Sequence, residues 1–238
     1  GVYKVVEDHL GNCWLATDAN GGTIEYYDNI SGKFYHRPFG RIENLAILED
    51  KSHKIWIGSS DALYTCNYMF KKIESYSHND ADVNSISNNA VSAILRDHSG
   101  KLLIGSFGVD YFDPVSKNFT RIKLVEKGKN ILENNRVWNI HQDSKNIIWF
   151  GTIIGLISYN PLTKKHHWYK HDENDSTSLS ASSCTGFIED SKGRYWVTTW
   201  GGGLNSFDPL SGKFRAFKVH EGNNSISVNS LGNIFEDS

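Results

Sequence analysis

Short apolar runs alternate with polar, turn-forming segments along the whole chain. Each apolar run is only a few residues long, and none shows the 3.6-residue apolar period of an amphipathic helix. The polar segments between the runs are rich in Asp, Asn, Ser and Gly, as tight chain reversals require. The pattern therefore predicts an all-β protein made of many short strands.

The apolar runs recur in a repeating unit, which is marked by an aspartate ahead of a short turn and an apolar strand. Successive marker aspartates lie 42, 47, 46, 47 and 47 residues apart. Six residues after each of the first five comes a tryptophan or a leucine, and a small residue follows two places later. Each unit holds four short strands, which is typical of a β-propeller blade. The marker aspartates are Asp8, Asp50, Asp97, Asp143, Asp190 and Asp237.

We therefore expect a β-propeller of about five four-stranded blades, with one extra inner strand after them. The whole chain, residues 1–238, is predicted to be one partial propeller, a slice of a larger ring. Such a slice exposes sheet edges and suggests a homodimer as one partner arrangement. The expected blades cover approximately residues 1–40, 41–86, 87–133, 134–180 and 181–228, and residues 229–238 begin a sixth.

Two segments carry a resemblance to a known family. Residues 143–161, DSKNIIWFGTIIGLISYNP, and residues 190–209, DSKGRYWVTTWGGGLNSFDP, resemble the two-component regulator propeller repeat. The resemblance recurs in five units and covers nearly the whole chain, although the first two units fit less well. It implies a seven-bladed propeller in the periplasmic part of a hybrid two-component histidine kinase from polysaccharide-degrading gut bacteria. It further implies an oligosaccharide signal, a parent protein anchored in the inner membrane, and missing blades and downstream domains outside this chain.

Composition narrows the set of partners. The net charge is −2 and 22% of residues are charged, so the chain has no basic footprint for nucleic acid. No apolar stretch is long enough to enter a membrane, so this segment is expected to make no direct membrane contact. The cysteines have neither disulfide nor zinc-motif spacing, and we interpret them as core residues. They are Cys13, Cys66 and Cys184.

Most conspicuous polar residues recur at one place in every unit, which indicates a structural role. The marker aspartates have two readings, a ring of carboxylates for a metal or acid catalysis, and an aspartate turn that accepts backbone N–H groups. We favour the turn, and we interpret the tryptophans that follow as packing between blades. Residues 80–85, DADVNS, begin like a calcium loop, but the expected glycine and glutamate are absent. In the segment HHWYKH, we expect His166 to pack and His167 and His171 to be solvated.

Residues that break the repeat are better functional candidates. The tip of the hairpin between the second and third strands differs in every unit, and unit 4 uniquely offers Arg136 and Trp138 near the start of its inner strand. Chain direction puts these positions on one face, where aromatic rings with a nearby arginine suit sugar stacking. The alternative is that the tryptophans cover the blade tops or contact a neighbouring domain. The hairpin-tip residues are Asp18, Ser60, Phe107, Ile153 and Trp200, and the predicted ligand-binding residues are Trp200, Trp138, Arg136 and Phe107.

The leading hypothesis is an extracytoplasmic, ligand-sensing propeller segment that passes its signal to a kinase outside this chain. The alternatives are a protein-interaction scaffold and, behind it, a propeller lyase. No metal-protease, phosphate-loop or nucleophile motif is found, and no converging histidine and glutamate pair breaks the repeat. We therefore expect no enzyme activity, no catalytic residue, no metal and no cofactor.

Overall fold

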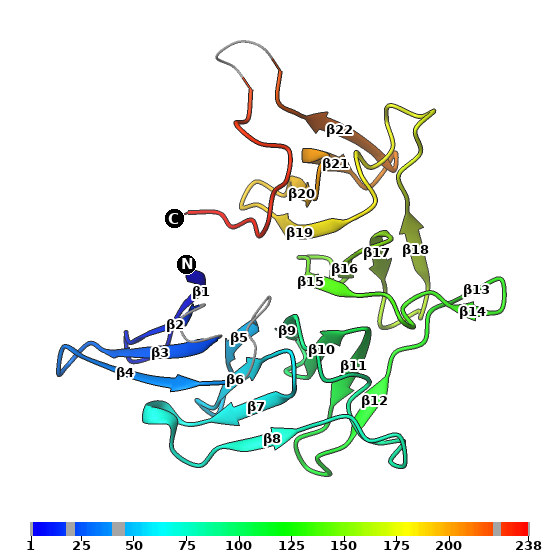
Figure 1. Cartoon of the computed structure of the whole chain (residues 1–238). Helices are drawn as coiled ribbons and strands as arrows, with labels where there is room; N and C mark the ends of the chain where they lie inside the picture. The colour runs from blue at the N-terminus through cyan, green and yellow to red at the C-terminus, as the bar shows by residue number, and fades with distance from the viewer. Residues whose placement is uncertain (1, 18–21, 40–45, 221–224, 238) are drawn as a thin grey trace. The chain divides into compact units, whose positions relative to one another are not determined.

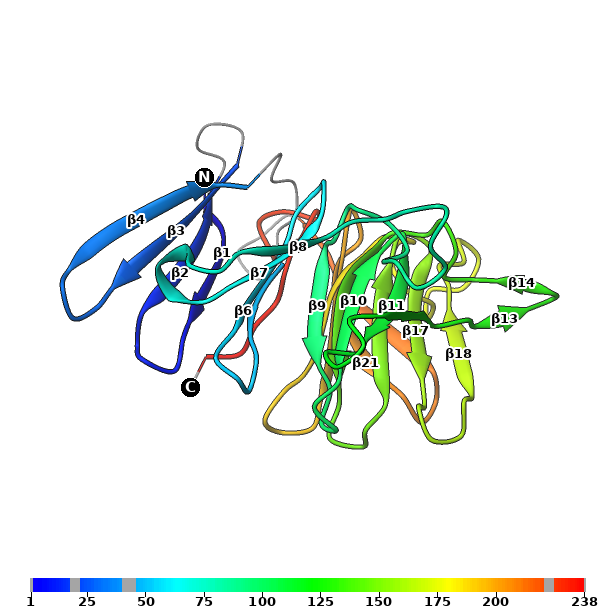
Figure 2. The same cartoon turned by 90° about the horizontal axis from the view of Figure 1, so that it is seen from below.

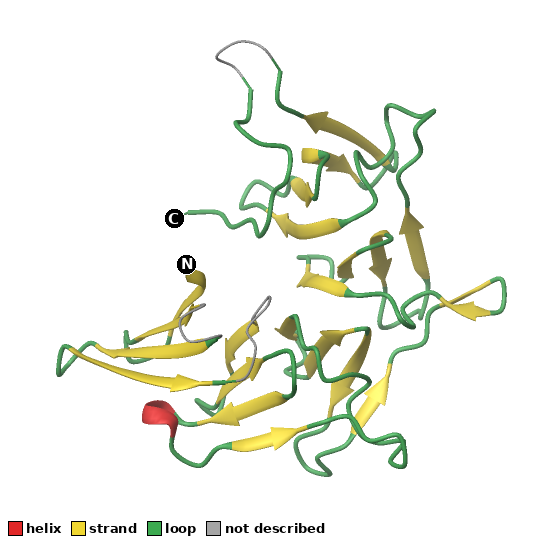
Figure 3. Ribbon diagram, viewed as in Figure 1, coloured by secondary structure: helices red, strands yellow, loops and turns green. Residues whose placement is uncertain are grey.

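Strands make up nearly all the regular structure of the protein. The computed structural model describes residues 2–17, 22–39, 46–220 and 225–237, and within them the single 3-10 turn is η2 (Tyr68–Phe70) (Figure 3). Five antiparallel sheets have four strands and one has two (Figure 1). In every four-stranded sheet the strands lie in chain order, which is the meander of a propeller blade. The predicted all-β propeller architecture is confirmed, and the sheets are called blades 1 to 5 in chain order.

The chain divides into two compact units, which are described separately. Unit 1 comprises residues 1–123 with 132–134, and unit 2 comprises residues 124–131 with 135–238. The organisation of residues 1–238 as a single propeller domain stays a prediction.

Unit 1 contains blades 1, 2 and 3, whose inner strands are neighbours in pairs. Blade 1 consists of β1 (Val2–Glu7), β2 (Cys13–Thr17), β3 (Thr23–Asp28) and β4 (Lys33–Pro38). Blade 2 consists of β5 (Ala46–Glu49), β6 (Ile55–Gly58), β7 (Leu63–Cys66) and β8 (Glu74–Tyr76). Blade 3 consists of β9 (Ala93–Arg96), β10 (Leu102–Ser106), β11 (Gly108–Phe112) and β12 (Phe119–Arg121).

Unit 2 contains blades 4 and 5 and a small hairpin. The hairpin lies beside β18 in both views (Figures 1 and 2), and its Glu126 is 3.9 Å from His166 Nε2. Blade 4 consists of β15 (Val137–Gln142), β16 (Ile148–Thr152), β17 (Gly155–Tyr159) and β18 (His166–Tyr169). Blade 5 consists of β19 (Cys184–Glu189), β20 (Tyr195–Thr199), β21 (Gly203–Asp208) and β22 (Lys213–Phe217). The hairpin strands are β13 (Val125–Glu126) and β14 (Lys129–Asn130).

The core lies between successive blades rather than within a single sheet. In unit 2, the indole of Trp149 on β16 stacks on Phe187 of the next blade with ring centroids 4.6 Å apart. In unit 1, Trp14 meets Phe70 of blade 2 edge to face, with ring centroids 5.4 Å apart. Aromatic burial of this kind stabilises adjacent sheets more than any single surface contact can. The tryptophans of the second strands are therefore packing residues, as the repeat predicts.

A small residue follows each of these tryptophans because the next blade passes close by. A Cβ at Gly58 would lie 2.6 Å from a side-chain carbon of Val91, and a Cβ at Gly151 would lie 2.9 Å from the carbonyl oxygen of Cys184. Neither distance leaves room for a larger residue without movement of the backbone.

Residues 225–237 occupy the place of a next inner strand but pair into no sheet among the described residues. Thr185 and Thr198 of blade 5 donate their hydroxyls to the carbonyl oxygens of Leu231 and Gly232, both at 2.6 Å. A strand pairs its backbone N–H and C=O groups with those of a neighbouring strand. Each of these side-chain bonds instead pairs one carbonyl oxygen. The predicted inner strand over residues 229–236 is therefore seen as irregular chain without a ladder.

The cysteines behave as core residues. Cys66 and Cys184 are buried, and Cys13 is partly buried. Burial raises the pKa of the thiols of Cys66 and Cys184 to about 12, which keeps both protonated and unreactive at neutral pH.

Candidate functional site

In the aspartate turn between the first and second strands, the carboxylate oxygens accept hydrogen bonds from nearby donors. Asp143 is the clearest case: its Oδ1 accepts the backbone N–H groups of Lys145 and Ile147 at 3.0 and 2.8 Å. Its Oδ2 accepts the indole N–H of Trp149 at 2.8 Å and the hydroxyl of Tyr195 at 3.2 Å. The structural reading of these aspartates is confirmed. The same indole bond joins Asp8 to Trp14, Asp50 to Trp56 and Asp190 to Trp196.

Electrostatics at these turns favours the carboxylate. Burial by itself would raise the pKa of Asp190, but the N–H donors of Trp196 and Arg194 outweigh it and hold the pKa at about 2. The pKa values of Asp8 and Asp50 are lowered in the same way. A carboxylate that accepts three or more hydrogen bonds stabilises its turn. Its lowered pKa makes it too weak a base for acid–base catalysis at neutral pH.

A glutamate clamp joins successive blades beside the aspartate turns, and the repeat alone did not reveal it. Glu189 of blade 5 accepts the backbone N–H and the hydroxyl of Ser144 of blade 4 at 2.6 and 2.8 Å. Glu236 accepts the same two groups of Ser191, both at 2.7 Å. The sequence signal was present, because each glutamate directly precedes a marker aspartate.

The connections from the fourth strand to the next blade are held by their own side chains. In the calcium-like segment, Asp82 accepts the backbone N–H of Asn84 at 2.9 Å, and Ser85 donates its hydroxyl to Asn79. The structure therefore favours the interpretation of residues 80–85 as a connection held by its own side chains over that of a calcium loop.

A histidine locks two of these connections. The Nδ1 atoms of His78 and His171 lie 2.7 and 2.6 Å from the carbonyl oxygens of Ile86 and Leu179. The expectation that His171 is merely solvated was wrong, because the loop folds back over its ring. Comparing the two connections in the alignment would have shown the repeated histidine.

Trp200 stands at the opposite end of blade 5, in the turn between β20 and β21. Its backbone N–H donates to Ser183 at 2.9 Å, and its side chain is 67% exposed. Gly201 and Gly203 follow with φ of +87° and +78°, a region that other residues rarely adopt. The triple glycine thus shapes the hairpin, while the indole of Trp200 is left on the surface.

Arg136 and Trp138 form a pair at the same end of blade 4. The guanidinium of Arg136 lies over the indole of Trp138, 4.4 Å from its ring centroid. Trp138 occupies an irregularity in the β15–β16 ladder, where the register shifts between Val137 and Asn139. Such a bulge re-aims a side chain. The Trp138 Nε1 atom is buried and has no hydrogen-bond acceptor within the described ranges.

The predicted ligand residues are thus only partly brought together. Arg136 and Trp138 are in contact, Trp200 belongs to the next blade of unit 2, and no ring contact joins the two tryptophans in the described part of the chain. Phe107, half-buried at the β10–β11 turn, lies in unit 1, and Asp18 lies outside the described residues.

Surface hollows lie elsewhere on the described residues. Two on blade 5 both have Trp196, Arg215 and Phe217 among their lining residues, and another is lined by residues 34–37 with Phe70. None of these three hollows includes the predicted ligand residues.

A buried polar pair near the hairpin ends differs between two blades. Asp110 of blade 3 accepts the backbone N–H and the hydroxyl of Ser87 at 2.8 and 2.6 Å. In blade 5 the corresponding residue is Asn205, which accepts the backbone N–H of Ser180 and donates to its hydroxyl at 3.2 and 2.8 Å. Burial raises the pKa of Asp110. The bonds from Ser87 and the guanidinium of Arg121, 3.8 Å away, lower the pKa but do not cancel the rise.

Comparisons with known proteins agree with the repeat. Residues 131–153 match a family model described as two component regulator propeller. The protein named histidine kinase P4 of Formosa agariphila is 31% identical over 202 residues, which cover 82% of this chain and 14% of that protein. The resemblance drawn from the repeat is confirmed. Within the described residues, no helix has the length and apolar content that crossing a membrane requires.

Solved structures share the fold. The extracellular domain of a putative hybrid two component system from B. thetaiotaomicron aligns with a TM-score of 0.74 at 17% identity, over 99% of this chain and 36% of that chain. A catalytically inactive virginiamycin B lyase from Staphylococcus aureus aligns with a TM-score of 0.66 at 14% identity, over 94% and 72% of the two chains. The chain therefore has the propeller fold and spans only a minor part of the sensor proteins that it resembles.

Proposed function

We propose that this chain, which carries the two-component regulator propeller repeat, is a ligand-sensing segment of a hybrid two-component regulator. It lies on the periplasmic side of the inner membrane, responds to an oligosaccharide and passes the signal to a kinase domain outside the chain. The family match at residues 131–153 and the relative named as a histidine kinase support this proposal. The remaining blades and the downstream domains of the parent protein are its partners, and the segment itself is not catalytic.

The pairing of Arg136 with Trp138 is the observation that carries the ligand proposal. The pair combines an aromatic ring, a cation and a buried indole N–H that lacks an acceptor among the described residues. An unmet buried donor is costly, at about 1–3 kcal/mol, unless a ligand or water meets it. A sugar hydroxyl is such an acceptor, and sugar rings stack on aromatic faces through their C–H groups.

The turn ends of blades 4 and 5 offer a sugar no such opening. Both oxygens of Asp143 accept donors from blades 4 and 5, and Glu189 is held by the preceding blade. Ligand recognition is therefore assigned to the hairpin end, where residue identity differs between blades. Trp200, exposed on the neighbouring blade of unit 2, adds a second aromatic surface at that end. Phe107 is the candidate residue of unit 1.

A panel of plant and algal oligosaccharides titrated calorimetrically against the chain tests the proposal. Trp138→Phe removes the indole N–H and keeps an aromatic ring, and Arg136→Ser installs the residue that blade 5 has at Ser183. We expect each change to weaken binding of the active glycan by about tenfold or more, since one charge-assisted or buried hydrogen bond is worth about 1.5–3 kcal/mol.

Leu210→Ala is the matched control, because Leu210 is an exposed apolar residue in the turn between β21 and β22. It should bind like the unaltered chain. The ligand proposal is wrong if the parent ectodomain binds no glycan, or if both variants bind it with unchanged affinity.

A protein-interaction scaffold is the second candidate function, and the exposure of Trp200 favours it. In that case Trp200→Ala would abolish binding to a defined partner domain. Neither the unaltered chain nor any variant would bind a glycan. Sedimentation of the chain would at the same time test whether the partner is a second copy.

A further inference from the structure

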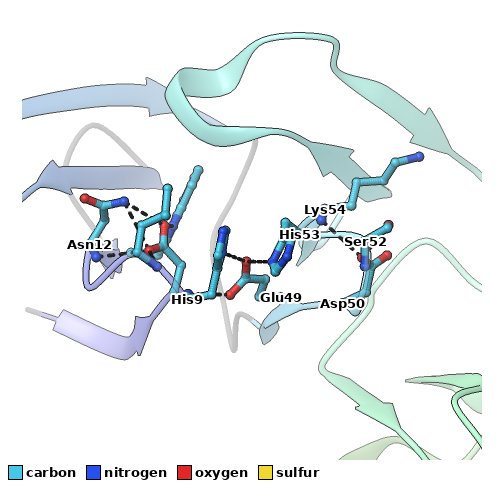
Figure 4. Close-up of polar contacts among 10 residues, drawn as sticks. His9, Asn12, Glu49, Asp50, Ser52, His53 and Lys54 are labelled. Atoms are coloured by element: carbon cyan, nitrogen blue, oxygen red, sulfur yellow. Dashed lines mark hydrogen bonds and ion pairs between the residues drawn. The ribbon is translucent and has the colours of Figure 1, made fainter.

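A cluster of two histidines and a glutamate lies at the turn ends of blades 1 and 2, within unit 1. His9 follows β1, Glu49 ends β5, and His53 lies in the turn before β6 (Figure 4). One ligand atom from each residue lies within 4.8 Å of the other two. Both rings are turned toward the Glu49 carboxylate, and the two imidazoles stack with centroids 3.4 Å apart.

Glu49 is the glutamate clamp of this blade boundary. Its Oε2 accepts the backbone N–H of His9 at 2.8 Å, as Glu189 and Glu236 accept those of Ser144 and Ser191. The other oxygen, Oε1, faces the Nδ1 atoms of His9 and His53, the latter at 3.0 Å. The clamp thus recurs at other blade boundaries, where the second carboxylate oxygen accepts a serine hydroxyl. Among the described clamps, only that of Glu49 has this oxygen facing two imidazoles.

His53 stands where the fold favours glycine. It is the third residue after the marker aspartate and has φ of +61°. The four corresponding residues of the other blades all have positive φ as well, and a histidine there gives up the conformational ease that glycine provides. Turn formation therefore does not explain this side chain. The corresponding residues are Gly11, Gly100, Asn146 and Gly193.

We propose that His9, Glu49 and His53 bind a divalent transition-metal ion, with Zn²⁺ as the chemical type. Two imidazole nitrogens and one carboxylate oxygen form a donor set typical of three-ligand zinc sites. Tetrahedral zinc would hold these donors about 3.4 Å apart, which their present spacing allows with small rotations of the rings. The backbone N–H of His9 orients the carboxylate from its second oxygen, as supporting bonds do around metal sites.

The exposure of the cluster leaves room for a fourth ligand. The side chains of His9 and His53 are 39% and 55% exposed, whereas Glu49 is 14% exposed. Water, or a donor from another molecule, would complete the coordination. The metal would fasten blade 1 to blade 2 at a boundary where the clamp already joins them.

The test uses the 238-residue chain without an affinity tag, stripped of metal and titrated calorimetrically with ZnCl2. The two variants copy residues that other blades use at the same positions, so neither should unfold the protein. His9→Ser restores the Ser144 type of clamp, and His53→Gly restores the Gly193 type of turn. His98→Ser is the control, because His98 follows the marker aspartate of blade 3 and lies outside the cluster.

We expect one zinc ion per unaltered chain, and a loss of affinity of at least roughly tenfold in each cluster variant. The control should bind like the unaltered chain. At equal zinc concentration, the melting temperature of the unaltered chain should rise more than that of His53→Gly, because stabilisation follows the fraction of chain with metal bound. Co²⁺ in place of zinc should give the visible absorption of a tetrahedral site.

Two results would overturn the proposal. One is that the unaltered chain binds no zinc at millimolar concentration, which would leave the cluster as a set of histidine–carboxylate hydrogen bonds. The other is that His9→Ser and His53→Gly bind zinc as tightly as the unaltered chain, which would place the metal elsewhere.

Discussion

The two ends of a blade treat a buried carboxylate in opposite ways. At the turn end, Asp190 accepts N–H groups from its own turn and from Trp196, and its pKa falls to about 2. Near the hairpin end, Asp110 is buried with a single serine and a more distant guanidinium, and its pKa rises. The turn end thus supplies a full set of donors in the same blade, whereas the hairpin end leaves polar groups incompletely matched. A scaffold with a separate recognition surface needs polar groups that are fully hydrogen-bonded at one end, and residues that can vary between blades at the other.

Truncation of a turn-end tryptophan should produce the largest loss. Trp149→Ala removes a buried indole that stacks on Phe187 and donates to Asp143, so we expect unfolding to become easier by about 3–5 kcal/mol. Urea denaturation followed by intrinsic fluorescence and circular dichroism would measure it. A loss below that of Trp200→Ala would refute the assignment of packing to this end.

The aspartate of the same turn should come second. Asp143→Ala leaves two backbone N–H groups, one indole N–H and the hydroxyl of Tyr195 without this acceptor, which we expect to cost about 2–4 kcal/mol. Blade 3 provides the comparison, because Leu103 replaces the tryptophan and Asp97 accepts no indole bond. Asp97→Ala should therefore cost less, about 1–2 kcal/mol. Equal losses in the two blades would contradict the contribution of the indole.

Exchanging the hairpin-end residues should have unequal effects. Asn205→Asp replaces a donor to Ser180 and Val197 by a buried carboxylate, so we expect a loss of about 2 kcal/mol at pH 7. Asp110→Asn removes a charge that burial disfavours and keeps an acceptor for Ser87, so we expect a change below about 1 kcal/mol. Paired denaturation curves would check both, and a larger loss for Asp110→Asn would reverse the comparison.

Acid should act on the two ends with opposite sign. Asp190 has a folded-state pKa of about 2 against an ordinary 3.8, so its contribution is present above pH 4 and is lost as pH falls toward 2. Asp110 has a raised pKa, so its contribution is fully present below its ordinary value and is lost as pH rises through the folded-state pKa. Stability curves of Asp190→Asn and Asp110→Asn between pH 2 and pH 7 would separate the two. Parallel curves would show that the two ends do not differ.

Loss of the exposed tryptophan should have the smallest effect on stability. Trp200→Ala is expected to change the free energy of unfolding by less than about 0.5 kcal/mol, because the side chain is 67% exposed and only its backbone bonds to Ser183. Denaturation and ligand titration on the same sample would compare its structural and recognition roles. A loss of several times that size would make Trp200 a packing residue.

The repeat predicted the fold because each blade solves the same local problem with the same residues. The spacing of the aspartates, the tryptophan six places later and the small residue after it all follow from contacts that recur in the structure. The lack of a strand ladder over residues 229–236 could not be predicted from the pattern, since pairing depends on a neighbour and not on the segment alone. At the candidate site, Arg136 and Trp138 meet because they are two residues apart at the start of β15, Arg136 just before the strand and Trp138 on it.

Other contacts escaped the pattern because they join distant parts of the chain. The glutamate clamp and the cluster of His9, Glu49 and His53 form only when two blades pack together. Nothing in the local sequence around Glu49 shows that its partner is His9, 40 residues earlier. The roles of His78 and His171 were within reach, because both histidines occur in corresponding connections.

The clamp has a consequence for synthesis of the protein on the ribosome. Ser144 finds its acceptor in Glu189, and Ser191 finds its own in Glu236, in both cases 45 residues later. At an elongation rate of about 5–20 residues per second, each blade waits about 2–9 s for the next one to emerge. The clamp of a nascent blade can therefore form only after the next glutamate has been synthesised, so we expect the clamps to form in the order of translation.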